Sequence, residues 1–160
     1  MQQKWSEFNA LLKLQPSSER VQLLLAQAHI AQGEYSAAYN ILSRISSLFM
    51  TPAGISACYH CLTLANRDSS VYLKDLLKSG TPTSSVAVTA LLQVADLFVS
   101  MSDYSSASSA LKLVLQSSVI DSTARITVTA KLIVALSHVD PSEAERYISN
   151  IPQVFLCFTY

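Results

Sequence analysis

Small and large apolar residues recur along this chain at the spacings of helices that pack in pairs. The clearest case is the stretch 25–42, in which two apolar runs are separated by Gly33. Positions three and four apart lie on one face of a helix, and a glycine between two such runs indicates a turn. The stretch therefore predicts two helices that meet at Gly33 and pack through Leu25, Ala26, His29, Tyr35, Ala38 and Leu42.

The pattern returns 69 positions later, counted from Leu25 to Val94, and Ser102 then stands in the place of Gly33. The corresponding packing residues are Val94, Ala95, Phe98, Tyr104, Ala107 and Leu111. This separation is close to two periods of the tetratricopeptide repeat, which is roughly 34 residues long. A last pair keeps the local spacings at Ala130, Ile133, Ala144 and Ile148, with a connection expected to be two residues longer.

Read in order, the same periodicity predicts an all-α chain. Helices are expected over residues 1–14, 18–32, 35–49, 52–66 and 69–78, then over a pair spanning 83–118, and finally over 121–138 and 141–149. The pair over 52–78 is degenerate, and Cys61 is placed at its small position, one period after Ala26. The predicted fold is a tetratricopeptide-like helical-repeat solenoid, an α-α superhelix of about four helix pairs. It forms a single array over 1–152, followed by an atypical apolar stub over 153–160.

Composition favours a packed, uncharged protein. Apolar residues make up 50% of the 160 residues and charged residues only 14%, with Lys+Arg and Asp+Glu equal at 11 each. Without concentrated positive charge, direct binding of nucleic acid is poorly supported. The most apolar run, over 86–101, contains Gln93 and Asp96 and is too short to span a membrane, so no membrane insertion is expected. Three cysteines make no disulfide framework, and the absence of a secretory signal agrees with a cytoplasmic protein.

Few residues suggest chemistry. Cys58 and Cys61, with His60 between them, resemble part of a zinc or thiol-exchange motif, but tetrahedral zinc needs more ligands than this segment offers. On a helix the two cysteines share a face, where burial is the favoured interpretation. His29 and His138 have no nearby nucleophile or paired carboxylate, and no glycine-rich phosphate loop is present. The sequence therefore predicts neither an enzyme nor a cofactor, metal or small-molecule site.

The solvent-facing positions are rich in serine rather than in charge. Polar filler is the favoured interpretation, and a smooth surface for a protein partner is the alternative. The positions expected on the inner helices, Leu23, Gln27, Leu92 and Asp96, carry no basic cluster. A receptor for the carboxylate of a partner's C-terminus is therefore disfavoured.

A more specific resemblance lies near the end of the chain. The run 130–147, with Val139-Asp140-Pro141 at its centre and Ile151-Pro152 after it, resembles the last helix pair of the seventy-two-kilodalton subunit of the signal recognition particle. That family has a similar leucine-rich helix, a Val-Asp-Pro turn and a Leu-Pro close. The stretch 25–43 is similar to an earlier repeat of the same subunit, so the resemblance covers about residues 19–152.

The resemblance implies a scaffold of the cytosolic ribonucleoprotein that targets nascent secretory proteins to the endoplasmic reticulum. In that family, earlier repeats hold the companion sixty-eight-kilodalton subunit, and a basic segment beyond the last repeat contacts the particle's 7S RNA. Neither region has matching positions here, so no RNA-binding residue is carried over, and a fragment or truncated variant is expected. The alternative is a generic tetratricopeptide adaptor for protein-protein interaction in another cytosolic complex.

Overall fold

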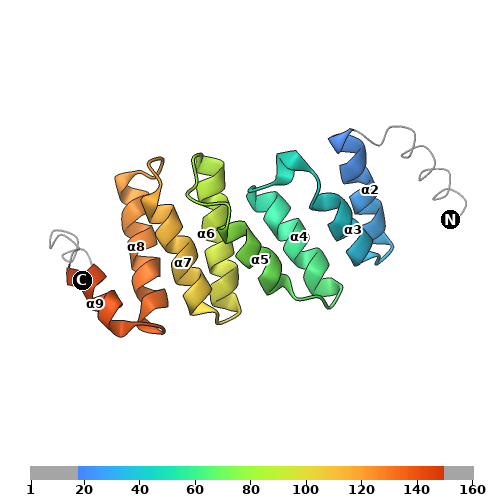
Figure 1. The fold of residues 1–160 in the computed structure, drawn as a ribbon. Coiled ribbons are helices and arrows are strands. Elements are labelled where there is room, and N and C mark those ends of the chain that lie inside the picture. The colour runs from blue at the N-terminus through green and yellow to red at the C-terminus, as the bar shows by residue number, and fades with distance from the viewer. Residues whose placement is uncertain (1–17, 150–160) are drawn as a thin grey trace, which may run out of the picture. The chain divides into compact units, whose positions relative to one another are not determined.

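All regular structure in residues 18–149, which the computed structural model describes, is helical (Figure 1). In order, the described elements are α2 (Glu19–Ala31), α3 (Tyr35–Leu42), the short 3-10 helix η1 (Ser46–Leu48), α4 (Pro52–Leu64), α5 (Ser69–Leu77), α6 (Ser85–Ser100), α7 (Tyr104–Gln116), α8 (Ser122–Ser137) and α9 (Pro141–Ser149). The predicted all-α helical-repeat fold class is confirmed. The helix predicted over 1–14 and the stub over 153–160 lie outside the described residues.

The chain divides into two compact units, Met1–Leu76 and Leu77–Tyr160. Helices α2 to α4 and nearly all of α5 belong to the first unit, and α6 to α9 belong to the second. The single array expected over 1–152 stays a prediction, and each unit is described by itself.

Small residues let α2 and α3 pack closely in the first unit. Ala26 and Ala38, one from each helix, are fully buried. Because protein interiors are close-packed, a methyl group at each of these positions leaves room for the two backbones to approach. Their core cluster is completed by Leu42, Ile45, Cys58 and Cys61.

The turns within the helix pairs share one backbone form. Gly33, between α2 and α3, has a φ of 76°, and Ser102, between α6 and α7, has a φ of 59°. Glycine adopts this region freely, whereas a residue with a side chain is strained in it. The turn after α4 has the same form at Asn66, with a φ of 53°. Tyr59 lies as far before Asn66 as Ala26 lies before Gly33, so Tyr59 is the residue that corresponds to Ala26. The assignment of Cys61 to this position from the sequence is therefore wrong.

Helix α3 ends at Leu42, whereas the periodicity predicts a helix over 35–49. The carboxylate of Glu19, in the first turn of α2, accepts hydrogen bonds from the Ser46 hydroxyl at 2.6 Å and the Ser47 amide at 3.2 Å. These bonds tie the start of η1 to α2. The continuous helix predicted over 35–49 is therefore wrong, and a side chain from another helix holds the segment that follows α3.

In the second unit, large buried side chains from successive helices form the core. Figure 1 shows α7 between α6 and α8, and α9 packs against α8. The largest fully buried side chains here include Leu91, Val94, Phe98, Leu111, Val114, Leu132 and Leu136. The buried Ser117 hydroxyl donates to the Pro82 carbonyl oxygen at 2.7 Å and thereby ties the segment before α6 to the end of α7.

Side-chain caps define where several of these helices begin. The Asp103 carboxylate accepts a hydrogen bond from the Ser106 amide at 3.1 Å, and the Asp121 carboxylate accepts one from the Ala124 amide at 2.7 Å. Each bond satisfies an amide that has no partner within its helix.

The last helix pair differs from the sequence prediction in its register. Three residues, 138–140, join its two helices. The helix pairs joined at 32–34 and 101–103 also have connections of three residues, so the predicted longer connection is wrong. Counted back from the turn, Leu132 and Ala135 occupy the places of Ala95 and Phe98, and both are buried. The large and small side chains have therefore exchanged places, which a search for the small-then-large spacing does not detect.

Two predicted packing residues of this pair are consequently exposed. Ala130 faces solvent because Leu132 takes the interior position on α8. Ile148 is 46% exposed in the last turn of α9, where Ala144 supplies the buried contact one turn earlier. The packing role predicted for Ala130 and Ile148 is wrong.

Candidate protein-interaction surfaces

The packing residues predicted from the sequence lie mostly inside the two units, where they support surfaces rather than form them. Buried are Ala26, Ala38, Leu42, Val94, Ala95, Phe98, Ala107, Leu111 and Ala144. Partly buried are Leu25, His29, Tyr35, Tyr104 and Ile133, and Gly33 is exposed in its turn. A partner must therefore contact other side chains.

Cys58 and Cys61 are packing residues. Each is only 3% exposed, and desolvation raises the pKa of both thiols, so little reactive thiolate forms. Cys58 shares a hydrogen bond with the Tyr72 side chain, whereas His60 is exposed beside Tyr59. Within residues 18–149, no group of three or more His, Cys, Asp or Glu side chains is arranged to hold a metal ion.

Two histidines are held at helix ends. The Nδ1 atom of His29 lies 2.6 Å from a carboxylate oxygen of Glu34, across the α2–α3 turn. His138, at the end of α8, stacks on the ring of Tyr104, with centroids 4.1 Å apart and planes 14° from parallel. Both contacts connect residues near the turns of helix pairs, and the stacking of Tyr104 on His138 was not foreseen from the sequence because it joins two different pairs.

Helices α6 and α8 present a surface of little charge, which we call the α6–α8 face. It is formed by the exposed residues Asp96, Val99, Thr127, Lys131 and Val134. The Lys131 ammonium donates to both carboxylate oxygens of Asp96, at 2.7 and 2.9 Å. Both side chains are well exposed, so this pair adds little stability, but it links the exposed sides of α6 and α8. Val99 is 40% exposed and Val134 60% exposed.

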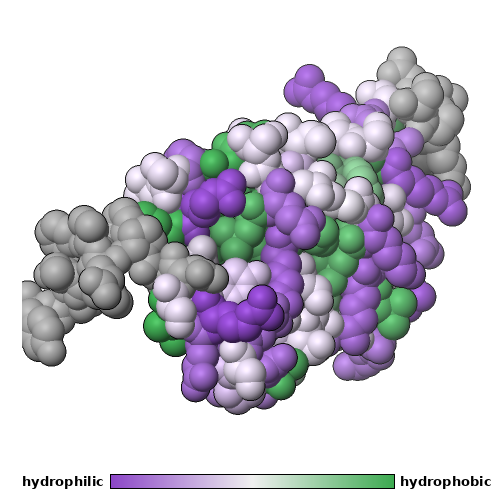
Figure 2. Space-filling model, turned by 60° about the vertical axis from the view of Figure 1, so that its left-hand side comes forward, coloured by the Kyte–Doolittle hydropathy of each residue, from purple (hydrophilic) through white to green (hydrophobic). Residues whose placement is uncertain are grey.

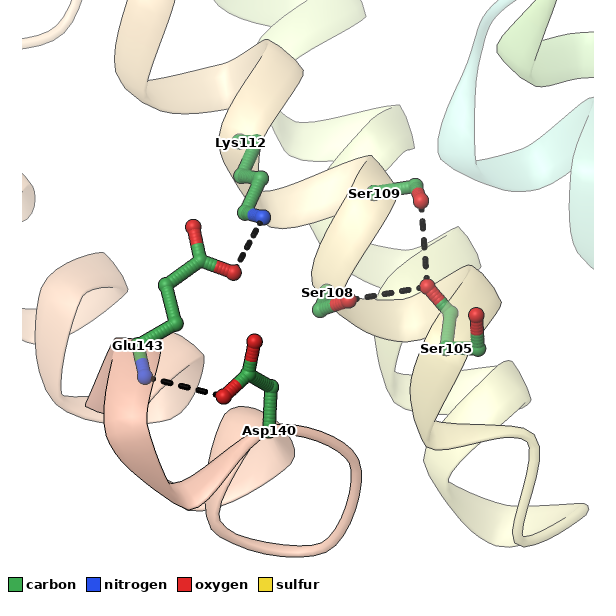
Figure 3. A network of polar contacts seen from close by, with 6 residues as sticks. All are labelled: Ser105, Ser108, Ser109, Lys112, Asp140 and Glu143. Atoms are coloured by element: carbon green, nitrogen blue, oxygen red, sulfur yellow. Dashed lines mark hydrogen bonds and ion pairs between the residues drawn. The ribbon is translucent and has the colours of Figure 1, made fainter.

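A second surface follows α7, α8 and α9, where a cavity of about 350 Å³ is found. On one side, the Lys112 ammonium on α7 donates to the Glu143 carboxylate on α9 at 2.8 Å, and Figure 3 shows the two side chains reaching toward each other. The Glu143 amide donates to the Asp140 carboxylate at 3.0 Å, which caps α9. Arg125 donates to the backbone oxygen of Leu115 at 2.7 Å. These charges bind one another, so the cavity is chiefly a structural junction.

Several serine hydroxyls, of the buried Ser108 and of some exposed serines, bond to their own helix. The hydroxyls of Ser108 and Ser109 both donate to the carbonyl oxygen of Ser105, at 2.8 and 3.0 Å (Figure 3). The hydroxyls of Ser100 and Ser137 likewise donate to carbonyl oxygens three positions earlier, each at 2.7 Å. Such hydroxyls are already satisfied as donors, which agrees with the polar-filler interpretation.

The surface is mixed in polarity. On the face drawn in Figure 2, hydrophobic residues form separate patches among polar ones. No helix in the described part of the chain has the length and hydropathy needed to cross a membrane. Exposed large apolar side chains include Val99 and Val134 of the α6–α8 face.

Comparison with known proteins places a repeat at the start of the chain. The family model described as tetratricopeptide repeat matches residues 6–51, which include α2, α3 and η1. Comparison with curated proteins and with solved structures finds no match. The chain therefore carries a tetratricopeptide-like repeat, a class of helical scaffold that binds proteins and is generally non-catalytic.

Proposed function

We propose that this chain is a non-catalytic scaffold that binds a protein partner on the α6–α8 face. The observation that carries the proposal is the exposure of Val99 and Val134 on two helices that the Asp96–Lys131 ion pair links. The central part of a protein interface is apolar and poor in charge, with polar groups at its rim. A partner segment lying across α6 and α8 would bury both valines.

A single charge on this face tests the proposal. We expect Val134→Asp to weaken partner binding at least about tenfold, because it places a carboxylate in the apolar part of the interface. Val119→Asp is the matched control, since Val119 is 43% exposed but lies between α7 and α8, outside the face. Proteins that bind both the parent and Val119→Asp would be identified, and the amount of each that Val134→Asp captures would then be measured. Circular dichroism would verify that both variants fold. Equal capture by both variants would exclude this face.

We infer further that the setting is cotranslational targeting to the endoplasmic reticulum, in the cytoplasm. Support comes from the resemblance of 130–147 to the seventy-two-kilodalton subunit of the signal recognition particle. Asp140 and Pro141 in that run act as the N-cap and first residue of α9. The partners implied by the family are the sixty-eight-kilodalton subunit and the particle RNA.

Co-purification of the tagged chain distinguishes this setting from the alternative. Recovery of the sixty-eight-kilodalton subunit or the particle RNA would support it. Recovery of neither, with other proteins captured through the α6–α8 face, would favour a general adaptor in another complex. The chain has no net charge, and exposed serines such as Ser109 and Ser137 bond to their own helices, which is compatible with that second role.

A further inference from the structure

The first unit contains a cavity of about 300 Å³ that the proposed scaffold function does not use. Its walls include the rings of Tyr39 on α3 and Tyr72 on α5, and charged side chains of Arg67, Asp68 and Asp75 also line it. All of these residues lie within the unit Met1–Leu76. The volume suits one side chain of a partner rather than a large ligand.

The two tyrosine rings are held in a defined arrangement. Their centroids are 5.9 Å apart and their planes meet at 88°, which is an edge-to-face contact. Both rings pack against the core cluster of the first unit, and Tyr72 also shares a hydrogen bond with Cys58. Desolvation raises the pKa of both phenols, so both remain neutral. Neutral aromatic faces carry the negative quadrupole that attracts cations.

A cation of the chain itself already uses this arrangement. The guanidinium carbon of Arg67 lies 5.7 Å from the centroid of the Tyr39 ring. Arg67 reaches this place from the turn after α4, where its amide donates to the Leu62 carbonyl oxygen at 2.9 Å. The cavity therefore accepts a planar guanidinium, and stacking on an aromatic face is a property that distinguishes arginine from lysine.

The charges that line the cavity favour a second cation. Among the lining residues, Arg67 contributes one positive charge, whereas Asp68 and Asp75 contribute two negative charges. Lys74, which is not among the lining residues, also acts on Asp68. Hydrogen bonding from Ser70 lowers the pKa of the Asp68 carboxyl, which therefore stays ionised at neutral pH. An anionic ligand would be repelled by the two carboxylates, and an uncharged one would gain nothing from them.

We propose that this cavity binds an arginine side chain of a protein partner. Its guanidinium would have the tyrosine rings on one side and the carboxylates of Asp68 and Asp75 on the other. Arg67 then acts as a resident competitor that shares the Tyr39 ring with the incoming guanidinium. The site is independent of the α6–α8 face, which belongs to the second unit, so either proposal can fail without the other.

The test uses the full chain and two small probes of nearly equal shape. N-acetyl-L-arginine amide carries the charged guanidinium, and N-acetyl-L-citrulline amide replaces it with a neutral urea. We expect the arginine probe to shift the ring NMR signals of Tyr39 and Tyr72 in a saturable way, and the citrulline probe to do so at least severalfold more weakly. Equal responses to the two probes, or no saturable response of these rings, would overturn the proposal.

Charge variants locate the effect. Arg67→Gln removes the positive charge that competes for the Tyr39 ring. We expect roughly threefold tighter binding, which is the effect in water of two like unit charges on the order of 6 Å apart. The double variant Asp68→Asn, Asp75→Asn is expected to lose most of the arginine response. Glu145→Gln, which removes an exposed carboxylate from α9, is the matched control and should bind like the parent. An undiminished response in the double aspartate variant would place the arginine elsewhere and refute the site.

Discussion

Gly54 offers a direct test of how η1 packs on α4. Gly54 is buried in the first turn of α4, and its amide donates to the Thr51 hydroxyl oxygen at 3.1 Å. A Cβ added there would lie 2.9 Å from the Leu48 Cβ and would collide with the Leu48 carbonyl oxygen. Because the nearest atom is backbone, rotation of a side chain cannot relieve the collision.

The two effects of Gly54→Ala oppose each other. Alanine is favoured over glycine within a helix by about 1 kcal/mol. Overpacking a close contact costs about 1–3 kcal/mol, and a backbone collision belongs at the upper end of that range. We therefore expect a net destabilisation of about 1–2 kcal/mol, measured as a lower midpoint of urea unfolding for the first unit.

Gly33 supplies the matched control, because its difficulty is conformational rather than steric. A Cβ there meets nothing within 4 Å, but the φ of 76° disfavours alanine by about 1–2 kcal/mol. Asparagine tolerates this region, as Asn66 does in its own turn. Gly33→Asn should thus be milder than Gly33→Ala, whereas Gly54→Asn should be at least as harmful as Gly54→Ala. A Gly54→Ala variant as stable as the parent would refute the described contact between η1 and α4.

Two further perturbations address packing and pH. Ala95→Leu should destabilise the second unit by about 1–3 kcal/mol, because Ala95 is buried between helices, whereas Ala130→Leu on exposed α8 surface should change thermal stability little. Hydrogen bonds lower the pKa of the Glu19 carboxyl, chiefly the bond from the Ser46 hydroxyl and then those from Ser47. The ionised carboxylate therefore stabilises the fold above the ordinary glutamate pKa, and this stabilisation is lost as pH falls through the lowered pKa. The melting temperature of Glu19→Gln should therefore lie below that of the parent at about pH 7 and equal it at about pH 3. A difference in melting temperature that persists in acid would contradict the role of the carboxylate.

The features that the sequence predicts well are those decided by nearby residues. The positions of the turns at Gly33 and Ser102 follow from the periodicity on either side of them, and both turns occur where expected. The cap at Asp140 depends on an amide three positions later, so the local sequence contains both partners. Local structure of this kind can be derived from spacing alone.

The errors arise where a distant residue decides the outcome. Helix α3 ends at Leu42, and the segment after it is bonded to Glu19, whose carboxylate accepts from Ser46, 27 positions away in sequence. In the last pair, Leu132 and Ala135 on α8 stand in the order large then small, where Ala95 and Phe98 on α6 stand small then large, and all four are buried. A fixed small-then-large template selects Ala130 instead, although its side chain is exposed.

The candidate binding sites are the least accessible to sequence reasoning for the same physical cause. Tyr39 and Tyr72 belong to helices α3 and α5, and each alone fits the apolar pattern of its helix. Their edge-to-face contact, and the placement of Arg67 over one ring, exist only once the turn after α4 has brought the segments together. Periodicity selects buried positions, whereas recognition depends on exposed residues that no period constrains. The repeat therefore predicts the scaffold, and its partner must be sought through the charge and aromatic content of the particular surfaces that the scaffold assembles.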